Sequence, residues 1–283
     1  MGIYSDVLLT VDFDRTMTAP DSTIPERNME AIRYFMDNGG AFTINTGRGL
    51  PMFRALLDVV PVNAPLLLYN GSAAYDRDKG EFAFLYPIDL DMKQTMIRAI
   101  ELFPEMTVEV QGVDAHYLFK EDIAWRDFTA ANNCPWEYAS LDDDLGPFLK
   151  FAVYGKITDV TVAHLYGGTP EEIAEIDRAQ DILEKEFGDV CSVFRPADRI
   201  LDIQARGVSK GRAARDLLEQ MGRKVLVCVG DGENDVTMMD EADFAYCPAD
   251  AIIRDRYENV CDCADGAVAD VIYKKIPEIL EVS

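Results

Sequence analysis

The sequence predicts an α/β fold in which a doubly wound parallel-sheet core is interrupted by an inserted α+β cap domain. Over about the first seventy residues, short branched apolar runs alternate with amphipathic helical patterns, as in a parallel sheet covered on both faces. After Tyr75 the pattern changes to aromatic-rich alternating stretches mixed with helices, and near residue 200 the first pattern returns. We therefore expect a discontinuous core of residues 1–75 and 199–283 and a cap of residues 76–198.

The composition is that of a soluble globular protein. The chain has 283 residues, 48% of them hydrophobic and 28% charged, which is enough for about two domains. Its formal net charge of −24, without basic clusters, excludes nucleic acid and anionic membranes as expected partners, because a polyanion needs positive side chains to hold it. No segment approaches the roughly 18 apolar residues of a membrane span, and no signal-peptide pattern opens the chain. We therefore expect a cytoplasmic protein.

The cysteines and histidines do not form a recognisable metal site. Six cysteines show no paired C-x-x-C spacing, and only two histidines could join them, so a zinc site is not expected. Cys228 lies in an apolar run and is expected to be a small core residue, whereas Cys261 and Cys263 are expected to be reduced loop thiols. His116 and His164 are each isolated among apolar or aromatic neighbours and are assigned no function.

The first expected strand, residues 7–11, is short, branched and almost uncharged, which is typical of a strand buried on both faces of a parallel sheet. Asp12 and Asp14 follow it, at the edge where α/β proteins bind ligands. Two desolvated carboxylates this close together repel each other unless they share a proton or a cation. An isolated pair of this kind is more often a solvated acidic turn. The remaining motifs must therefore decide between such a turn and a ligand-binding site.

Two further strands are expected to end near the same edge. After a helix that stops at Gly39–Gly40, residues 41–45 predict a strand ending in Thr46–Arg48. Residues 66–69 predict a third strand, ending in Asn70–Gly71. Hydroxyls, amides and glycines can approach an oxyanion closely without adding negative charge.

The cap region mixes expected strands and helices. Thr169 and the three residues after it form a good capping sequence for the second helix, and Asp142–Asp144 is expected to be a solvated turn. Residues 148–166 fit either two strands or one strand and a connector. The expected strands are 81–86, 107–110 and 117–120, and the expected helices are 91–103 and 170–187.

The first pattern returns with residues 200–203, followed by a glycine-rich turn and a helix. Ser209 can cap this helix, which places Lys210 in its first turn. A cation at a helix N-terminus is electrostatically unfavourable unless an anion also binds there. The alternative is an ordinary surface lysine.

A second acidic cluster follows the expected strand 225–229. The segment Gly230–Asp235 contains three acids and one amide on a strand-to-helix turn, more than a turn needs. Such oxygen-rich ligands suit magnesium, a hard ion that binds a few carboxylates and retains water. Together with Asp12 and Asp14, two acidic clusters can meet around one metal ion.

With these motifs in this order, the chain resembles the haloacid dehalogenase superfamily of phosphohydrolases, and specifically its Cof-type branch with a large α/β cap (subfamily IIB). The resemblance covers essentially the whole chain and implies a Rossmann-like core. Asp12–Thr16 matches the first family motif, Thr46–Arg48 the second, Lys210 the third and Gly230–Asp235 the fourth, and Asn70–Gly71 resembles the turn before the insertion.

The resemblance implies that Asp12 attacks phosphorus and forms an aspartyl-phosphate, while Asp14 gives a proton to the leaving oxygen and later takes one from water. It also implies a Mg²⁺ cofactor, whose charge lets an anionic nucleophile approach an anionic phosphate. The implied metal ligands are Asp12, the backbone carbonyl of Asp14, Asp231 and, directly or through water, Asp235. The implied phosphate-binding residues are Thr46, Gly47, Lys210 and Asn234, the last of which would orient either Lys210 or the phosphate.

One departure from the family pattern lies next to the catalytic acids. The family usually has glycine where this chain has Arg15, and leucine or isoleucine where it has Met17. Arginine takes a positive φ less readily than glycine, so the turn after Asp14 is expected to differ in shape. The side chain either points into solvent, which we favour, or reaches substrate.

The expected function is a magnesium-dependent phosphatase for a small phosphorylated metabolite. By analogy with the family, sugar phosphates are the leading substrate class. A cap that closes over the core would bind the leaving group and so determine substrate specificity. A phosphotransferase or phosphomutase on the same fold is the alternative. A non-catalytic phosphate-binding protein is less favoured, because binding alone has no use for Asp14 beside Asp12. The sequence does not indicate an oligomeric state.

Overall fold

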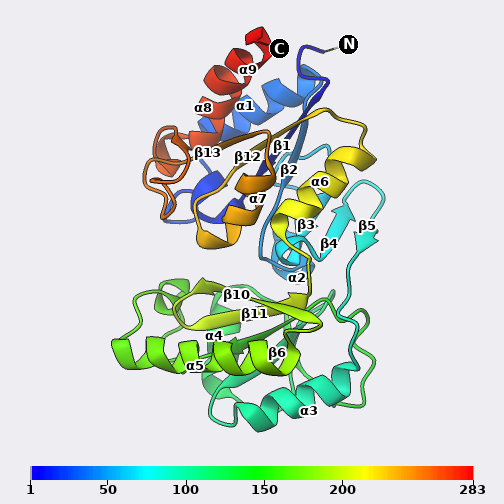
Figure 1. Ribbon diagram of the computed structural model, residues 1–283, viewed down its shortest axis with the longest axis vertical. Coiled ribbons are helices and arrows are strands. Elements are labelled where there is room, and N and C mark those ends of the chain that lie inside the picture. Colours follow the sequence, from blue (N-terminus) through cyan, green and yellow to red (C-terminus); the bar gives the residue numbers. More distant parts are fainter. Residues whose placement is uncertain (1, 283) are drawn as a thin grey trace. The chain divides into compact units, whose positions relative to one another are not determined.

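The computed structural model describes residues 2–282, which form two compact units (Figure 1). The core unit comprises the chain up to Gly47, Ala55–Phe84 and the chain from Ser209 onward. The inserted unit comprises Arg48–Arg54 and Leu85–Val208. Both units are therefore discontinuous in sequence.

The core unit is built on a five-stranded parallel sheet with the strand order β14-β13-β12-β1-β2. The interior strand β1 is fully buried, and its last residue, Val11, lies in register with Ile44 on one side and Val229 on the other. The residues that follow these three strands therefore emerge at one edge of the sheet. The strands are β1 (Val7–Val11), β2 (Ala41–Ile44), β12 (Val225–Val229), β13 (Phe244–Cys247) and β14 (Glu258–Asn259).

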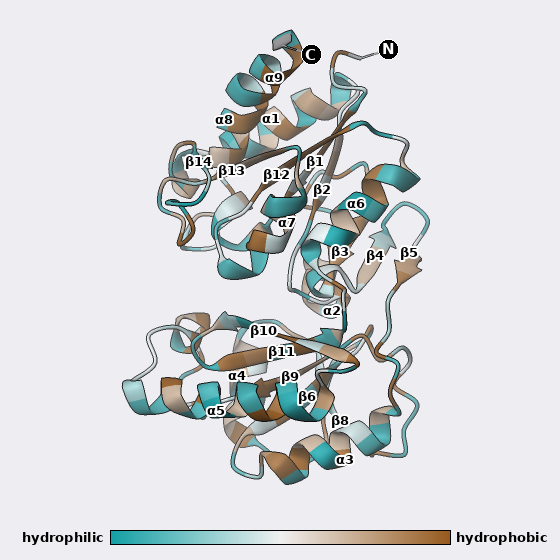
Figure 2. Cartoon of the chain, in the orientation of Figure 1, coloured by the Kyte–Doolittle hydropathy of each residue, from teal (hydrophilic) through white to brown (hydrophobic). Residues whose placement is uncertain are grey.

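Helices cover this sheet, and its central strands are strongly hydrophobic (Figure 2). A buried cluster joins α6 (Lys210–Gln220) and α7 (Val236–Glu241) to the sheet, with Leu217 and Met238 packed among residues of β1 and β12. The helix α1 (Glu26–Asp37) packs against β2 and α8 (Ala267–Asp270). The chain continues through a π-helical turn, Val271–Lys275, into α9 (Ile276–Val282).

The strand β3 (Leu66–Leu68) meets the parallel sheet at an isolated bridge between Asn45 and Leu67. It pairs instead in an antiparallel sheet with β4 (Ala73–Asp76), which is followed by β5 (Glu81–Leu85). The third strand expected at residues 66–69 is therefore present, but its main partner is an antiparallel strand and not a strand of the parallel sheet. Three successive positive φ angles, at Tyr69, Asn70 and Gly71, turn the chain back on itself directly after β3, so it pairs with its own continuation.

The inserted unit contains a six-stranded sheet with the order β10-β11-β9-β6-β7-β8. One face packs against α3 (Met92–Leu102) and α5 (Pro170–Phe187), and the other carries the aromatic residues of α4 (Ile123–Ala131). A short helix, α2 (Leu50–Phe53), also belongs to this unit. The strands are β6 (Thr107–Gln111), β7 (His116–Leu118), β8 (Trp136–Tyr138), β9 (Lys150–Tyr154), β10 (Cys191–Ala197) and β11 (Ile200–Ala205).

The structure corrects two assignments near the unit boundaries. Residues 200–203, expected to begin the return to the core, lie in β11, which pairs antiparallel with β9 and β10 in the inserted sheet. Conversely, residues up to Phe84, expected in the cap, group with the core. A short strand buried on both faces has the same composition in either sheet, so its neighbours in the fold decide where it pairs.

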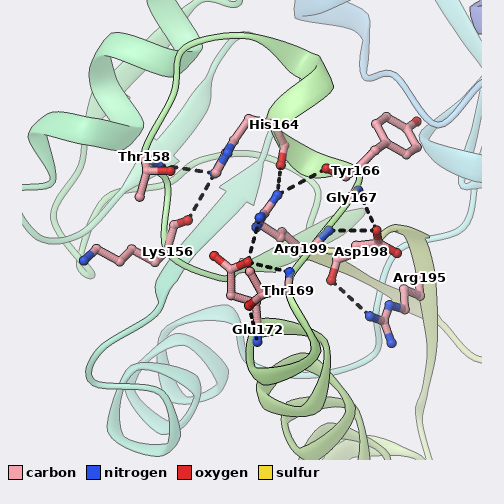
Figure 3. Close-up of polar contacts among 11 residues, drawn as sticks. Lys156, Thr158, His164, Tyr166, Gly167, Thr169, Glu172, Arg195, Asp198 and Arg199 are labelled. Carbon is pink, nitrogen blue, oxygen red and sulfur yellow. Dashed lines mark hydrogen bonds and ion pairs between the residues drawn. The ribbon is translucent and has the colours of Figure 1, made fainter.

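The segment that fitted two alternatives, residues 148–166, contains one strand, β9, and a connector that ends in a 3₁₀ turn, Val162–Leu165. Arg199 fixes the end of this connector, because its guanidinium donates to the carbonyls of His164 and Tyr166 and pairs with Glu172 at 2.6 Å (Figure 3). Asp198 accepts hydrogen bonds from the amides of Gly167 and Gly168. Thr169 and Glu172 then form the capping box of α5, which confirms the expected start of that helix.

A buried carboxylate, Glu109, organises the sheet face that packs on α4. It accepts hydrogen bonds from the Trp125 indole (2.8 Å), the Tyr154 hydroxyl (2.9 Å) and the Gln111 amide (2.7 Å), and His116 Nδ1 lies 3.2 Å away. Burial alone would raise the pKa of Glu109, but His116 and these donors hold it below its usual range. His116 is therefore a buried polar partner of Glu109 within the inserted sheet.

None of the helices within residues 2–282 is both long and apolar enough to cross a membrane. All six cysteines are free thiols, and Cys228 is a core residue of β12, as expected. Asp142–Asp144 is exposed, as expected for a solvated turn.

Gly211, in the first turn of α6, lies so close to α7 that a Cβ would be 2.0 Å from the carbonyl oxygen of Thr237. We expect Gly211→Ala to lower the free energy of unfolding by about 1–3 kcal/mol, since the two helices would have to move apart. Urea denaturation measures this, with Glu219→Ala, at an exposed position of α6, as the control. Equal stability of the two variants would contradict the prediction.

Candidate active site

The carboxyl edge of the core sheet brings the first and fourth motifs together. Asp12 directly follows β1, and its amide donates to the carbonyl of Val229, the last residue of β12, at 2.9 Å. Because the two strands are parallel and in register, the turn beginning at Gly230 starts beside Asp12. Asp12 is only 6% exposed. The pair Asp12 and Asp14 is therefore not an isolated solvated turn.

Three of the predicted acids, Asp12, Asp231 and Asp235, form one buried cluster. Each offers one carboxylate oxygen, and these oxygens all lie within 4.8 Å of one another. Asp14 is partly buried and contributes no carboxylate to the cluster. Its expected contribution through the backbone carbonyl stays a prediction.

Lys210 spans two of these acids. Its ammonium lies 2.6 Å from Asp12 Oδ1 and 2.6 Å from Asp235 Oδ1, and the residue is 1% exposed. Ser209 caps α6 by accepting from the amide of Arg212, which fixes Lys210 in the first turn as expected. Burial alone would lower the pKa of Lys210, but the carboxylates of Asp12 and Asp235 raise it above its usual value. Lys210 is therefore a buried cation of the site and not a surface lysine.

Asp235 holds the lysine with one oxygen and shapes its own loop with the other. Its Oδ2 accepts from the amides of Asp231 (3.0 Å) and Gly232 (2.9 Å). A Cβ at Gly230 would lie 2.6 Å from the Asp235 Cβ, so this position has no room for a side chain. The glycines of the fourth motif thus allow the acids to converge.

The acids of the site are short of positive charge. Burial, followed by the neighbouring Asp235, raises the pKa of Asp12 well above its usual value, although Lys210 opposes the shift. Burial and Asp235 likewise raise the pKa of Asp231 to about 7. A buried set of hard carboxylate oxygens that resists ionisation fits a divalent cation such as Mg²⁺, which would remove the repulsion.

The second motif lies at the end of β2, beside β1. The amide of Thr46 donates to Leu67, and the amide of Asn70 donates to the carbonyl of Thr46 at 3.0 Å. A Cβ at Gly47 would be 2.9 Å from Asn70 Oδ1, so a larger residue would displace the Asn70 side chain in the turn after β3. Thr46 and Gly47 therefore lie just after β2, at the same edge of the sheet as Asp12. Their contact with phosphate stays a prediction.

Two residues that support the site were not among the predicted site residues. Asn45 Nδ2 donates to the carbonyl of Lys210 at 2.9 Å, which ties the end of β2 to the first turn of α6. Thr16 Oγ1 donates to Asp231 Oδ1 at 3.1 Å. Thr16 could have been found from its place in the first motif, whereas nothing near Asn45 in sequence indicates its partner 165 positions away.

Asn234 is partly buried in the 3₁₀ turn Glu233–Asp235. Within residues 2–282, the hydrogen bonds of the Lys210 ammonium go to Asp12 and Asp235, so these acids orient the lysine. The expected role of Asn234 toward phosphate stays a prediction.

Arg15 adopts the left-handed conformation, with φ of +60°, in the turn after Asp14. The expected change of turn shape was based on arginine avoiding a positive φ, and the structure shows that it does not. Its amide donates to Thr18 Oγ1 at 3.2 Å, and its guanidinium Nε lies 3.8 Å from Asp231 Oδ2. Its side chain is 48% exposed, so it points neither wholly into solvent nor into the buried cluster.

The raised pKa of Asp231 predicts a pH-dependent stability of the metal-free protein. Folding raises this pKa from 3.8 to about 7, so the folded state binds the proton more tightly, and stability is lost as the pH rises between these values. We expect the free energy of unfolding of wild type, measured relative to that of Asp231→Asn, to decrease as the pH rises through this window. The decrease should be up to about 1 kcal/mol per pH unit. Urea denaturation in a chelator measures it. Parallel pH profiles of the two proteins would contradict it.

Comparison with known proteins agrees with this geometry. Residues 9–272 match the model of the haloacid dehalogenase-like hydrolase family. Two relatives carry the name "Putative phosphatase": one from Haemophilus influenzae is 22% identical over 86% of this chain and 85% of its own, and one from Streptococcus pyogenes is 25% identical over 82% and 83%.

Solved structures share the fold. A haloacid dehalogenase-like hydrolase from Bacteroides thetaiotaomicron superimposes with a TM-score of 0.77 at 17% identity, covering 95% of this chain and 98% of its own. A haloacid dehalogenase subclass IIB sugar phosphatase gives a TM-score of 0.73 at 15% identity, covering 96% and 99%. With its family motifs gathered at one sheet edge and the family model matched over nearly its whole length, the chain belongs to the haloacid dehalogenase-like hydrolases.

Proposed function

We propose that the protein is a magnesium-dependent phosphatase that hydrolyses a small phosphorylated metabolite through an aspartyl-phosphate intermediate. The observation that carries this proposal is the position of Asp12, whose buried carboxylate contacts Lys210 and clusters with Asp231 and Asp235 at the carboxyl edge of the sheet. A site that only binds phosphate does not need a buried carboxylate pointing at the anion, because the two would repel each other. A nucleophile does need to be there.

In the first half-reaction, a carboxylate oxygen of Asp12 forms a bond to phosphorus while the bond from phosphorus to the leaving oxygen breaks, and Asp14 gives its proton to that oxygen. In the second, Asp14 takes a proton from water, the water oxygen bonds to phosphorus, and the carboxylate of Asp12 is released. When bound by Asp12, Asp231, Asp235 and the backbone carbonyl of Asp14, Mg²⁺ supplies positive charge to the phosphoryl oxygens. Lys210 keeps the Asp12 carboxylate in one orientation throughout.

The phosphoryl oxygens would be bound by Thr46, Lys210, Asn234 and the backbone amides near Asp14 and Gly47. Support comes from their placement, because Thr46 and Gly47 follow β2, the neighbour of β1 in the sheet. These groups add no negative charge to the site. A local positive site of this kind reconciles an anionic substrate with a chain whose net charge is −24. By analogy with the subclass IIB sugar phosphatase, sugar phosphates are the leading substrate class.

A screen of phosphorylated metabolites tests the proposal. Wild-type protein with Mg²⁺ should release inorganic phosphate from at least one sugar phosphate or related small ester, and the Asp12→Asn variant should not. Each active substrate is then repeated with an added sugar acceptor. Phosphate release without a phosphorylated acceptor supports a phosphatase, whereas a phosphorylated acceptor would identify a phosphotransferase. No turnover of any phosphate ester would overturn the proposal.

A further inference from the structure

We propose that Arg15 binds a second anionic group of the substrate, so that the preferred substrates carry a carboxylate or another phosphate near the ester that is cleaved. This inference rests on the proposed phosphatase function and narrows its substrate class. It follows from the backbone conformation of Arg15, from its unused hydrogen-bond donors and from its place beside Asp14.

The conformation of Arg15 is unfavourable for an arginine. A non-glycine residue at a φ of +60° costs roughly 1–2 kcal/mol relative to the right-handed region, a cost that glycine avoids. A residue held in such a conformation beside catalytic acids is a candidate for a functional role.

The ion pair with Asp231 does not explain why arginine, and not glycine, occupies position 15. The two groups are 3.8 Å apart, beyond hydrogen-bond distance, and the Arg15 side chain is about half exposed. Exposed pairs of this kind contribute roughly 0–1 kcal/mol, which does not exceed the conformational cost. Structural stabilisation alone would therefore favour glycine at this position.

The guanidinium of Arg15 has N–H groups that can donate further hydrogen bonds. Across the described residues 2–282, the hydrogen bond of Arg15 is made by its backbone amide, to Thr18, and none is made by its side chain. A guanidinium carries five N–H donors in a planar fork that matches a carboxylate or phosphate group. The side chain is accessible, charged and already at the catalytic edge.

The position of Arg15 separates a second anion from the phosphoryl group that is transferred. Lys210 is buried between Asp12 and Asp235 and serves the inner side of the site, where the nucleophile lies. Arg15 is more exposed and directly follows Asp14, the residue proposed to protonate the leaving oxygen. Arg15 is therefore a cation at the rim of the acid cluster that is open to a second anion, whereas Lys210 is not.

The charge balance of the site agrees with this assignment. With Asp14 protonated, as the first half-reaction requires, the charges of Lys210 and a divalent cation match those of the three clustered acids, Asp12, Asp231 and Asp235. The charge of Arg15 is then in excess of this balance, and it can pair with a second anionic group on the substrate.

The test compares phenyl phosphate with its 2-, 3- and 4-carboxyphenyl analogues in the presence of Mg²⁺. For wild type, we expect kcat/KM to be about tenfold higher for the best carboxyphenyl ester than for phenyl phosphate, as one charge-assisted contact would give. Arg15→Gly and Arg15→Asn, which both tolerate a positive φ, should bring this ratio close to one. Arg15→Lys keeps the charge without the fork and should retain part of the preference.

The outcomes distinguish failure of this inference from failure of the proposed function. Turnover of all esters with an unchanged ratio in Arg15→Gly would overturn the role of Arg15 and leave the phosphatase in place. An equal loss for every ester would assign Arg15 to the transferred phosphoryl group and also overturn it. Absence of turnover by wild type would remove both proposals. Thermal melting adds a check, since Arg15→Gly should be at least as stable as wild type, and a large loss of stability would indicate a structural residue.

Discussion

Asp12→Asn is expected to lower phosphate release by about four orders of magnitude or more, since the amide cannot attack phosphorus to form the acyl-phosphate. The substitution keeps the size and shape of the side chain, and its amide oxygen can still accept a hydrogen bond from Lys210. Lys210 also retains Asp235 as a charged partner. The loss should therefore come from the chemical step and not from a displaced lysine.

The fold of this variant should survive, because the charge of Asp12 is unfavourable in the metal-free protein. Burial and the neighbouring acids raise the pKa of this carboxyl well above its usual value, so a neutral side chain relieves repulsion. We expect a melting temperature in a chelator no lower than that of wild type. Asp37→Asn, which changes an exposed acid at the end of α1, is the control and should keep full activity. Clear residual turnover by pure Asp12→Asn would remove Asp12 as the nucleophile.

Chelation of divalent cations is expected to stop turnover completely, and Mg²⁺ should restore it. The same ion should raise the melting temperature of wild type, because it would neutralise the buried oxygens of Asp12, Asp231 and Asp235. Asp231→Asn removes one ligand from this cluster and should lose most of the thermal shift. Isothermal titration with Mg²⁺ measures the affinity independently of activity.

The metal prediction has its own controls. Asp37→Asn should bind Mg²⁺ as wild type does, since its side chain is exposed and lies outside the acid cluster. A Mg²⁺-induced thermal shift of equal size in wild type and Asp231→Asn would place the ion elsewhere. Turnover that persists in excess chelator would rule out a metal-dependent reaction.

Local patterns in the sequence identified most of the parts of the site. The apolar run before Asp12 predicted β1, the run before Gly230 predicted β12, and the structure has both strands with the same bounds. Ser209 and Thr169 were expected to cap helices, and both do so. These features depend on neighbours a few residues away, whose chemistry is visible in the sequence.

The pairing of strands was less predictable. The strand β11 has the apolar character expected of a core strand, yet it belongs to the inserted sheet, and β3 turns back into an antiparallel sheet. Composition gives the burial of a strand but not the identity of its partners, because pairing depends on contacts between distant segments.

The sequence by itself determined which acids, hydroxyls and glycines stand at the ends of the core strands, and in what order. Only the tertiary structure decided how they meet. Lys210 reaches Asp12 across 198 positions of sequence, and the parallel register of β1 with β12 sets the distance between the two acidic motifs. The conformation of Arg15 was also decided there, because the turn after Asp14 holds this arginine at a φ of +60°, which its residue type disfavours.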